Sequence, residues 1–204
     1  MTPARAALTG QAEDYLKAIY EIERDGEPAA TTAIAERLQI APASVSGMIR
    51  RLGRQGLVVV ERYRGARLTA KGRRVALQMI LRHRILESFL VTRLGFGWDG
   101  VHDEAERLEH AASPELIERM AAALGHPEVD PHGAPIPRSD GTVDDARLPS
   151  LNDLAVGEQG RVARMSDRDP ALLRYLGELG IRPGVMLRLV DRAPFAGPLT
   201  VAVG

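Results

Sequence analysis

The stretch that decides the fold is TTAIAERLQIAPASVSGMIRRLGRQ, residues 31–55. A short helix capped by Thr31 or Thr32 is expected first, then a turn, then a second helix that Pro42 opens. The apolar residues of the second helix recur at helical spacing: Val45, Met48, Ile49 and Leu52. Two short helices joined by such a turn predict a helix-turn-helix DNA-binding module.

The other face of the second helix suits entry into a DNA major groove. Small hydroxyl side chains stand near its N-terminus, and arginines follow them. The residues expected to contact DNA in this module are Thr31, Thr32, Ser44, Ser46, Arg50, Arg51 and Arg54.

The next residues, 57–69, have the pattern of a wing. A β-branched run is followed by a basic turn around Gly65 and by a second short strand. Arg64 and Arg67 are expected to meet phosphates or a minor groove. A basic turn is often only solvated surface, but the helix-turn-helix pattern before it favours DNA contact.

The formal net charge of zero conceals an asymmetry between the two ends of the chain. Residues 1–75 carry a net charge of +5, and residues 76–204 carry −5. Residues 41–74 contain nine basic side chains and a single acid. A basic module joined to an acidic one suggests nucleic acid at one end and a cation at the other.

Helices flank the basic module on both sides. The apolar residues within 11–24 recur at mostly helical spacing, which predicts a helix there. A long helix is expected after Thr69. That helix carries more apolar surface than one small domain needs, so we expect two modules to share it. Surplus apolar faces on it and on the next two helices, 101–111 and 114–124, favour a homodimer, which would match a two-fold operator.

Two helical faces carry side chains that bind metals. On the predicted helix VHDEAERLEH, residues 101–110, one side presents His102, Glu106, Glu109 and His110. His83 and Glu87 are four residues apart on the long helix. Carboxylates suit Mn(II) and Fe(II), and imidazole suits most first-row metals. A solvated charged face is the alternative for either helix, but two such faces in one chain favour metal.

The rest of the chain, from residue 125, is more irregular. Residues 125–150, rich in Pro and Gly, predict an extended linker, in which Asp130 and His132 are either solvated polar residues or additional ligands. Residues 151–204 combine apolar runs with glycine turns and predict a small β-barrel-like domain. Since the chain ends within an expected strand, we expect a closing strand to be missing or disordered.

Composition and motifs restrict the class of protein. The chain has 204 residues and no cysteine, which excludes disulfides and thiolate metal sites. It lacks a signal-peptide core and any apolar run of about 18 residues, so a cytoplasmic protein without a membrane partner is expected.

Two rival functions can be weighed. A di-metal enzyme would use Glu-x-x-His spacing, whereas Glu109 and His110 are adjacent, and no phosphate loop or nucleophile motif is present. We therefore expect no enzyme and no small organic substrate. A winged-helix regulator that senses something other than metal is the second rival.

Short motifs stand in a specific order along nearly the whole chain. They are Glu13–Leu16, Ile34–Leu38, Ser44–Ser46, Gly56–Val58, Leu68–Gly72, Arg82–Arg84, Val101–Ala105, Leu108–His110, Asp130–Gly133 and Gly180–Gly184. Their order and spacing resemble the diphtheria toxin repressor family of iron- and manganese-dependent transcriptional regulators, including its C-terminal FeoA-type domain. The resemblance implies that metal stabilises a homodimer that binds double-stranded operator DNA and represses metal-uptake genes.

The resemblance also implies two metal sites. The primary site would consist of Asp14, Glu106, Glu109 and His110. The second site would draw on His83, Glu87 and His102, to which manganese-type members add Asp130, His132 and an acid of the barrel domain, here Asp167.

Two departures from the family's patterns bear on the metal. Iron-type members carry Cys where Glu106 stands and Met where Asp14 stands, so the harder set of oxygen and nitrogen ligands favours Mn(II), with Fe(II) second. Zn(II), Co(II) or Cd(II) are expected to substitute in vitro. Some manganese-type members have another acid where this chain has Lys17, which favours two separate sites over a paired-metal cluster. We expect Lys17 to face solvent or an acid. The alternative function is an iron-dependent repressor of iron-acquisition genes.

The expected architecture is mainly α, of the α+β class. Residues 1–74 would form a winged helix-turn-helix domain, and residues 75–146 a helical metal-binding and dimerisation domain that includes the linker. Residues 147–204 would form a small Src-homology-3-like (FeoA-type) β-barrel.

Overall fold

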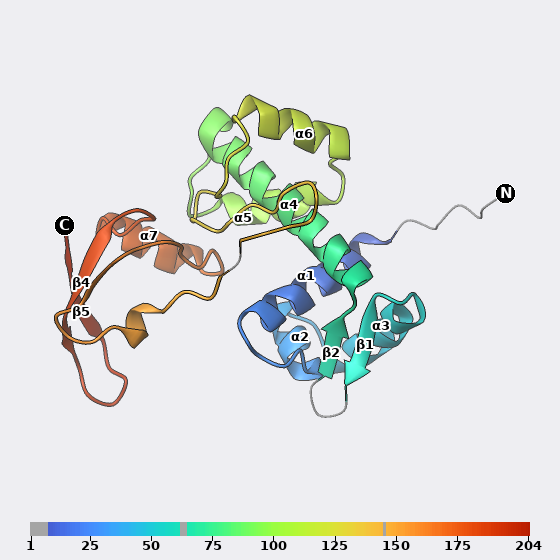
Figure 1. Cartoon of the computed structure of the whole chain (residues 1–204), viewed down its shortest axis with the longest axis horizontal. Coiled ribbons are helices and arrows are strands. Elements are labelled where there is room, and N and C mark those ends of the chain that lie inside the picture. Colours follow the sequence, from blue (N-terminus) through green and yellow to red (C-terminus); the bar gives the residue numbers. More distant parts are fainter. Residues whose placement is uncertain (1–7, 62–64, 145) are drawn as a thin grey trace. The chain divides into compact units, whose positions relative to one another are not determined.

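The computed structural model describes residues 8–61, 65–144 and 146–204 (Figure 1). The chain forms two compact units. The first spans Met1–Leu81 and Pro137–Asp145, and the second spans Arg82–Ile136 and Ala146–Gly204. Among the described residues, no helix combines the length and the apolar character needed to cross a membrane.

The first unit has the expected winged helix-turn-helix order. Its elements are α1 (Gly10–Arg24), α2 (Thr31–Arg37), α3 (Pro42–Arg54), β1 (Val58–Glu61), β2 (Gly65–Leu68) and the first half of α4 (Ala70–Leu94). Buried residues of α1, α2 and α3 form one core with Leu57 and Leu68. The expected cap of α2 was wrong: Ala30 is its N-cap without a side-chain hydrogen bond, because Thr31 and Thr32 already belong to the helix.

The wing is anchored at its base. β1 pairs antiparallel with β2, and Ala29, which precedes α2, forms a bridge with Ala66. Gly65 has a φ of 77°, and a Cβ there would lie 2.3 Å from the Ala29 carbonyl oxygen. Only glycine fits this approach, so the strand beside the wing turn is held against the segment before α2.

The second unit begins within α4 and continues through two shorter helices, α5 (Val101–Glu109) and α6 (Pro114–Ala123). Ser113 caps α6 by accepting a hydrogen bond from the Leu116 backbone N–H, as expected. The buried side of α5 consists of Val101, Ala105 and Glu109, which repeat every four residues. A carboxylate is therefore buried at the end of an apolar stripe.

The C-terminal part of this unit is a small antiparallel sheet with one helix. Its elements are η1 (Leu151–Asp153), β3 (Gln159–Arg161), α7 (Pro170–Glu178), β4 (Met186–Arg192) and β5 (Leu199–Val203), and the strand order is β3-β4-β5. Helices and two small antiparallel sheets confirm the predicted fold class.

The segment after α6 differs from the expected extended linker. The Asp130 N–H donates to the Ala134 carbonyl, and Val129 bridges to Pro135, so the chain doubles back on itself. Asp130 and His132 are buried within this turn. Their interpretation as solvated linker residues is therefore wrong, because the turn folds inward instead of running along the surface.

Candidate metal centre

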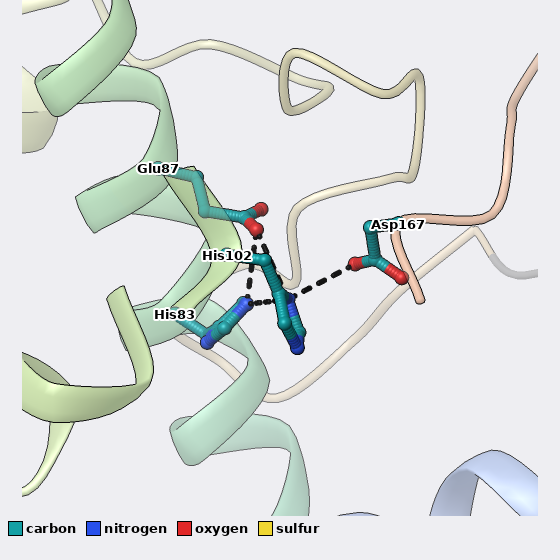
Figure 2. A group of neighbouring side chains, drawn as sticks. All are labelled: His83, Glu87, His102 and Asp167. Atoms are coloured by element: carbon teal, nitrogen blue, oxygen red, sulfur yellow. Dashed lines mark hydrogen bonds and ion pairs between the residues drawn. The ribbon is translucent and has the colours of Figure 1, made fainter. Parts of the chain in front are cut away.

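Two imidazoles and a carboxylate meet where α4 faces α5 (Figure 2). The His83 Nε2 atom lies 3.1 Å from Glu87 Oε1 and 3.0 Å from His102 Nδ1. His83 and Glu87 point the same way because they are one turn apart on α4. Two ring nitrogens at 3.0 Å cannot both present lone pairs, so either a proton or a cation must lie between them.

The fourth side chain of this group comes from the C-terminal part of the unit. Asp167, in the segment before α7, places Oδ2 3.5 Å from His102 Nδ1 (Figure 2). Donor atoms of His83, Glu87, His102 and Asp167 all lie within 4.8 Å of one another. This spacing suits one ion bound by two nitrogens and two carboxylates.

Charges in this group stabilise one another strongly. Burial alone would raise the pKa of Glu87, but the neighbouring imidazoles of His102, His132 and His83 hold that pKa well below its usual range. Burial alone would lower the pKa of His102, but Asp167 and Glu87 outweigh it and raise that pKa to about 10. In the metal-free protein, protons on the imidazoles therefore balance the buried carboxylates.

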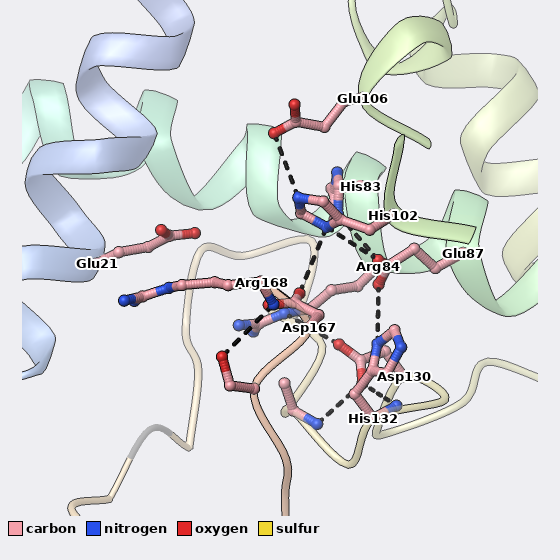
Figure 3. A network of polar contacts seen from close by, with 12 residues as sticks. Glu21, His83, Arg84, Glu87, His102, Glu106, Asp130, His132, Asp167 and Arg168 are labelled. Atoms are coloured by element: carbon pink, nitrogen blue, oxygen red, sulfur yellow. Dashed lines mark hydrogen bonds and ion pairs between the residues drawn. The ribbon is translucent and has the colours of Figure 1, made fainter. Parts of the chain in front are cut away.

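The second oxygen of Glu87 faces another imidazole (Figure 3). Glu87 Oε2 lies 3.7 Å from His132 Nδ1, and neither buried atom has a hydrogen-bond partner among the described residues. The other ring nitrogen, His132 Nε2, donates to the Trp98 carbonyl oxygen at 2.7 Å. That bond directs Nδ1 toward Glu87. Buried polar atoms usually have hydrogen-bond partners. Two facing ligand atoms that lack such partners, Glu87 Oε2 and His132 Nδ1, therefore fit a metal ion.

Asp130 is held beside this pair by backbone and arginine contacts. Its Oδ1 accepts hydrogen bonds from the backbone N–H groups of His132 and Ala134 at 2.8 and 2.9 Å. Its Oδ2 lies 3.5 Å from Nε of the buried Arg84, which also donates to the Pro135 carbonyl. Donor atoms of Glu87, Asp130 and His132 converge within 4.8 Å, so Glu87 belongs to both groups of donors.

The predicted primary ligands on α5 lie next to this cluster. Glu109 Oε2 is 2.6 Å from His83 Nδ1, so a buried hydrogen bond joins a primary-site residue to a second-site residue. Glu106 Oε1 lies 3.6 Å from His102 Nε2 (Figure 3), and His110 Nε2 lies 3.9 Å from Glu109 Oε1. Asp14 belongs to α1, in the other compact unit, so its meeting the α5 ligands remains a prediction.

Lys17 was expected to face either solvent or an acid. It is only 8% exposed, so it does not face solvent. The apolar stripe of α1 is wide, and the Lys17 side chain lies among its buried residues.

The predicted DNA face is mostly exposed. Thr31 and Thr32 start α2, and Ser44, Ser46, Arg50 and Arg54 lie exposed on α3. Arg51 is different, because it is half-buried and donates to the Thr9 hydroxyl at 3.1 Å. We therefore keep DNA contact as a proposal for Arg50 and Arg54, but not for Arg51. Arg67 is exposed and paired with Glu61, and Arg64 lies outside the described residues.

Sequence reasoning missed two residues that contact the predicted second-site residues. Arg84 stands within the motif Arg82–Arg84, but nothing in the pattern indicated that its cation would be buried against Asp130. Trp98 is the single tryptophan of the chain and lies between glycines in the α4–α5 loop. Its contribution is a backbone carbonyl, for which a sequence carries no signal.

Comparison with known proteins places the whole chain. Residues 7–66 of this chain match the family profile of the iron dependent repressor N-terminal DNA binding domain. Residues 69–138 match the profile of the iron dependent repressor metal binding and dimerisation domain. A FeoA domain profile matches residues 150–204. The iron-dependent repressor IdeR of Mycobacterium tuberculosis is 32% identical, and the alignment covers 97% of this chain and 90% of IdeR. This chain belongs to the diphtheria toxin repressor family.

Solved structures agree with this membership. A manganese-dependent transcriptional repressor in complex with manganese matches with a TM-score of 0.89 at 46% identity, covering 94% of this chain and 89% of that one. The manganese regulator SloR matches with a TM-score of 0.82 at 33% identity, covering 96% and 91%. The family consists of metal-dependent, DNA-binding transcriptional repressors and not of enzymes, which confirms the predicted class of function.

Protonation of the imidazoles is expected to make metal binding by this cluster pH-dependent. Burial lowers the pKa of His132, but Glu87 outweighs it and raises that pKa to about 9, while the pKa of His102 rises to about 10. Both imidazoles are therefore protonated at neutral pH and must lose a proton to bind a metal. We expect Mn(II) affinity at the second site to rise with pH between about 6 and 8, by about tenfold per pH unit for each proton released.

The measurement is calorimetric titration of Mn(II) at pH 7 in buffers of different ionisation enthalpy. His132→Ala should release about one proton fewer than the wild type. Binding without proton release would contradict this description of the metal-free site.

Proposed function

We propose that the protein is a Mn(II)-responsive repressor that acts in the cytoplasm as a homodimer on the operators of metal-uptake genes. The observation that carries the choice of metal is the donor set. The chain has no cysteine, and every side chain proposed as a ligand offers carboxylate oxygen or imidazole nitrogen. Such a set suits Mn(II) better than it suits soft metals. The 46% identity with a manganese-dependent repressor supports the same metal.

The proposed primary site consists of Asp14, Glu106, Glu109 and His110. Three of these residues stand on α5 or at its C-cap, whereas Asp14 stands on α1. A metal bound by residues of both helices would link α5 to α1, and α1 packs within the DNA-binding module. The metal would supply only this crosslink and its positive charge. It would favour the DNA-competent state by binding that state more tightly.

The proposed second site centres on Glu87. His83, His102 and Asp167 would act with one carboxylate oxygen of Glu87, and Asp130 and His132 with the other. Because Glu109 hydrogen-bonds to His83, occupation of one site would affect the orientation of a ligand in the other. Arg84 would offset the negative charge of Asp130.

Iron-dependent repression of iron-acquisition genes is the second candidate, favoured by the 32% identity with IdeR. The two can be separated by measuring operator affinity in the presence of Mn(II), Fe(II), Co(II) or Zn(II) at buffered free concentrations. Activation by Mn(II) at least as strong as by Fe(II) supports the proposal. Activation by Fe(II) with discrimination against Mn(II) would establish the second candidate instead.

Glu106 is the residue expected to set the preference for hard metals. Its carboxylate is half-exposed on α5, so a cysteine can replace it without creating a cavity in the core. Glu106→Cys should shift relative affinity toward Zn(II) and Cd(II) by about tenfold or more against Mn(II), because thiolate is a softer ligand. Competition binding of metal pairs measures the ratio, with Glu106→Asp as the variant that retains oxygen. An unchanged ratio in Glu106→Cys would remove Glu106 from the ligand set.

Arg54 at the end of α3 is proposed to contact a DNA phosphate. Arg54→Ala should weaken binding to all sequences and reduce the slope of log affinity against log salt by about one, because one phosphate contact is lost. Ser46→Ala should instead change sequence preference, since Ser46 lies near the N-terminus of the proposed recognition helix. Fluorescence anisotropy over a salt series measures both effects. A salt slope equal to that of the wild type would contradict the Arg54 assignment.

A further inference from the structure

Trp98 joins the second-site cluster to the C-terminal part of the unit. It lies in the loop between α4 and α5, and its carbonyl oxygen accepts the His132 Nε2–H bond at 2.7 Å. The two rings also lie close, with centroids 5.9 Å apart and planes tilted by 32°. The backbone carbonyl of Trp98 therefore directs His132 Nδ1 toward Glu87. The indole side chain of Trp98 takes no part in that hydrogen bond.

The indole ring of Trp98 packs against α7 and the turn that follows it. The Arg182 guanidinium carbon lies 4.7 Å from the ring centroid, in cation–π geometry. On α7, a Cβ added to Gly177 would lie 3.0 Å from Cζ2 of the indole, so the ring lies against the helix backbone where no side chain intervenes. Beside it, Arg174 Nε donates to Asp99 Oδ2 at 3.0 Å. Residues 98 and 99 thus contact α7 and Arg182 through three separate interactions.

The same C-terminal part also meets the turn that contains His132. The Met165 N–H donates to the His132 carbonyl oxygen at 2.9 Å. At Gly133, a Cβ would lie 2.1 Å from the Ala163 carbonyl oxygen, so only glycine permits this approach. Two residues after Met165, Asp167 reaches His102. The contact that positions His132 and the contact that positions Asp167 therefore belong to one continuous interface.

We propose that Trp98 is a positioning residue of the second metal site. Its indole ring contacts the Arg182 guanidinium and the backbone at Gly177, and these two contacts form a clamp. The clamp holds the C-terminal domain so that Asp167 lies beside His102, while the Trp98 carbonyl holds His132 toward Glu87. This inference rests on the proposed metal-sensing function. It adds that second-site metal affinity depends on a contact without any metal ligand in it. Because Asp167 and Trp98 share one interface, metal binding in turn tightens the clamp.

The clamp can be tested first without any metal, because the reporter is the only tryptophan in the chain. Arg182→Ala should shift Trp98 emission to the red and increase its quenching by acrylamide, since the ring loses its cover. Arg182→Lys should restore most of both signals because it keeps a cation over the ring. The matched control is Arg188→Ala, which removes an exposed arginine from β4 in the same domain. Equal spectra for Arg182→Ala and Arg188→Ala would overturn the clamp.

The second measurement is Mn(II) binding to the same variants, with His110→Ala added to each to weaken the proposed primary site; the protein that carries only His110→Ala is the parent. Arg182→Ala should lower second-site affinity by about two- to fivefold, which is what an exposed cation–π contact is worth. Arg182→Lys should recover it, and Arg188→Ala should match the parent. Mn(II) should also shift Trp98 emission to the blue in the parent, but less in Arg182→Ala.

The outcomes separate the inference from the function on which it rests. A parent protein that binds Mn(II) equally well with and without Arg182 contradicts the positioning role and leaves manganese sensing standing. A wild-type protein that binds no Mn(II) contradicts the proposed function, and the metal-free spectra then decide whether the clamp exists.

Discussion

Glu87→Gln is expected to abolish Mn(II) binding at the second site. Glu87 is fully buried, and its two oxygens face different groups of donors, with His83 and His102 on one side and His132 on the other. Gln has nearly the same shape but carries no charge, and its amide nitrogen cannot bind a metal. One substitution should therefore disable both halves of the site, with a loss of affinity of at least about 100-fold.

The same substitution should change the stability of the metal-free protein. Removing one partner of a buried ion pair costs about 3–5 kcal/mol when the remaining charge is fixed. The imidazoles around Glu87 can lose protons instead, so we expect the free energy of unfolding to fall by about 1–3 kcal/mol at neutral pH.

Two measurements test this prediction. Mn(II) stoichiometry by electron paramagnetic resonance should fall by one ion per chain, and urea unfolding without metal gives the stability. Glu118→Gln, on the exposed face of α6, is the matched control and should change neither quantity. Full Mn(II) stoichiometry and affinity in Glu87→Gln would show that Glu87 is not a ligand.

Asp14→Ala is expected to separate metal binding from DNA binding. Glu106, Glu109 and His110 stand on α5 and at its C-cap and are proposed to bind a metal without Asp14, so part of the affinity should remain. Asp14 is the proposed ligand from the DNA-binding unit, and without it the metal should no longer bias that unit. The metal-dependent gain in operator affinity, about 5- to 150-fold for a typical coupling, should fall to about twofold or less.

Glu109→Ala should behave differently from Asp14→Ala. Glu109 is buried and hydrogen-bonded to His83, so its loss removes a primary ligand and leaves a second-site imidazole without its partner. We expect this variant to lose both metal affinity and the gain in DNA binding. Glu13→Ala, which removes the neighbouring acid on α1, serves as the control and should keep both. Wild-type operator affinity in metal-loaded Asp14→Ala would mean that Asp14 is only an acid near a helix end.

Local signals predicted much of this molecule. Pro42 marks a helix start through its fixed φ, and Ser113 marks one by capping; both effects involve only neighbouring residues. The proposed ligand face of α5 was inferred from side chains three and four residues apart. Such features depend on the period of the helix, and a sequence displays that period directly.

Other features depend on contacts between distant parts of the chain. Asp130 and His132 stand in a segment whose composition indicates a solvated linker, yet Arg84 and the Trp98 carbonyl draw them inward from 46 and 34 positions away. Likewise, Arg51 donates a hydrogen bond to Thr9, which lies 42 positions away in the sequence. The resemblance to a known family suggested the two linker ligands, whereas no local pattern predicted the residues that hold them in place.

Mn(II) binding by this chain is proposed to control its affinity for DNA. The most direct measurement is anisotropy of a labelled operator duplex, selected from a random-sequence pool, titrated with protein at clamped free Mn(II) and then with a chelator. Saturating Mn(II) should tighten binding by at least about tenfold, and the chelator should reverse the gain in full. Equal operator affinity in Mn(II) and in chelator would contradict control of DNA binding by Mn(II).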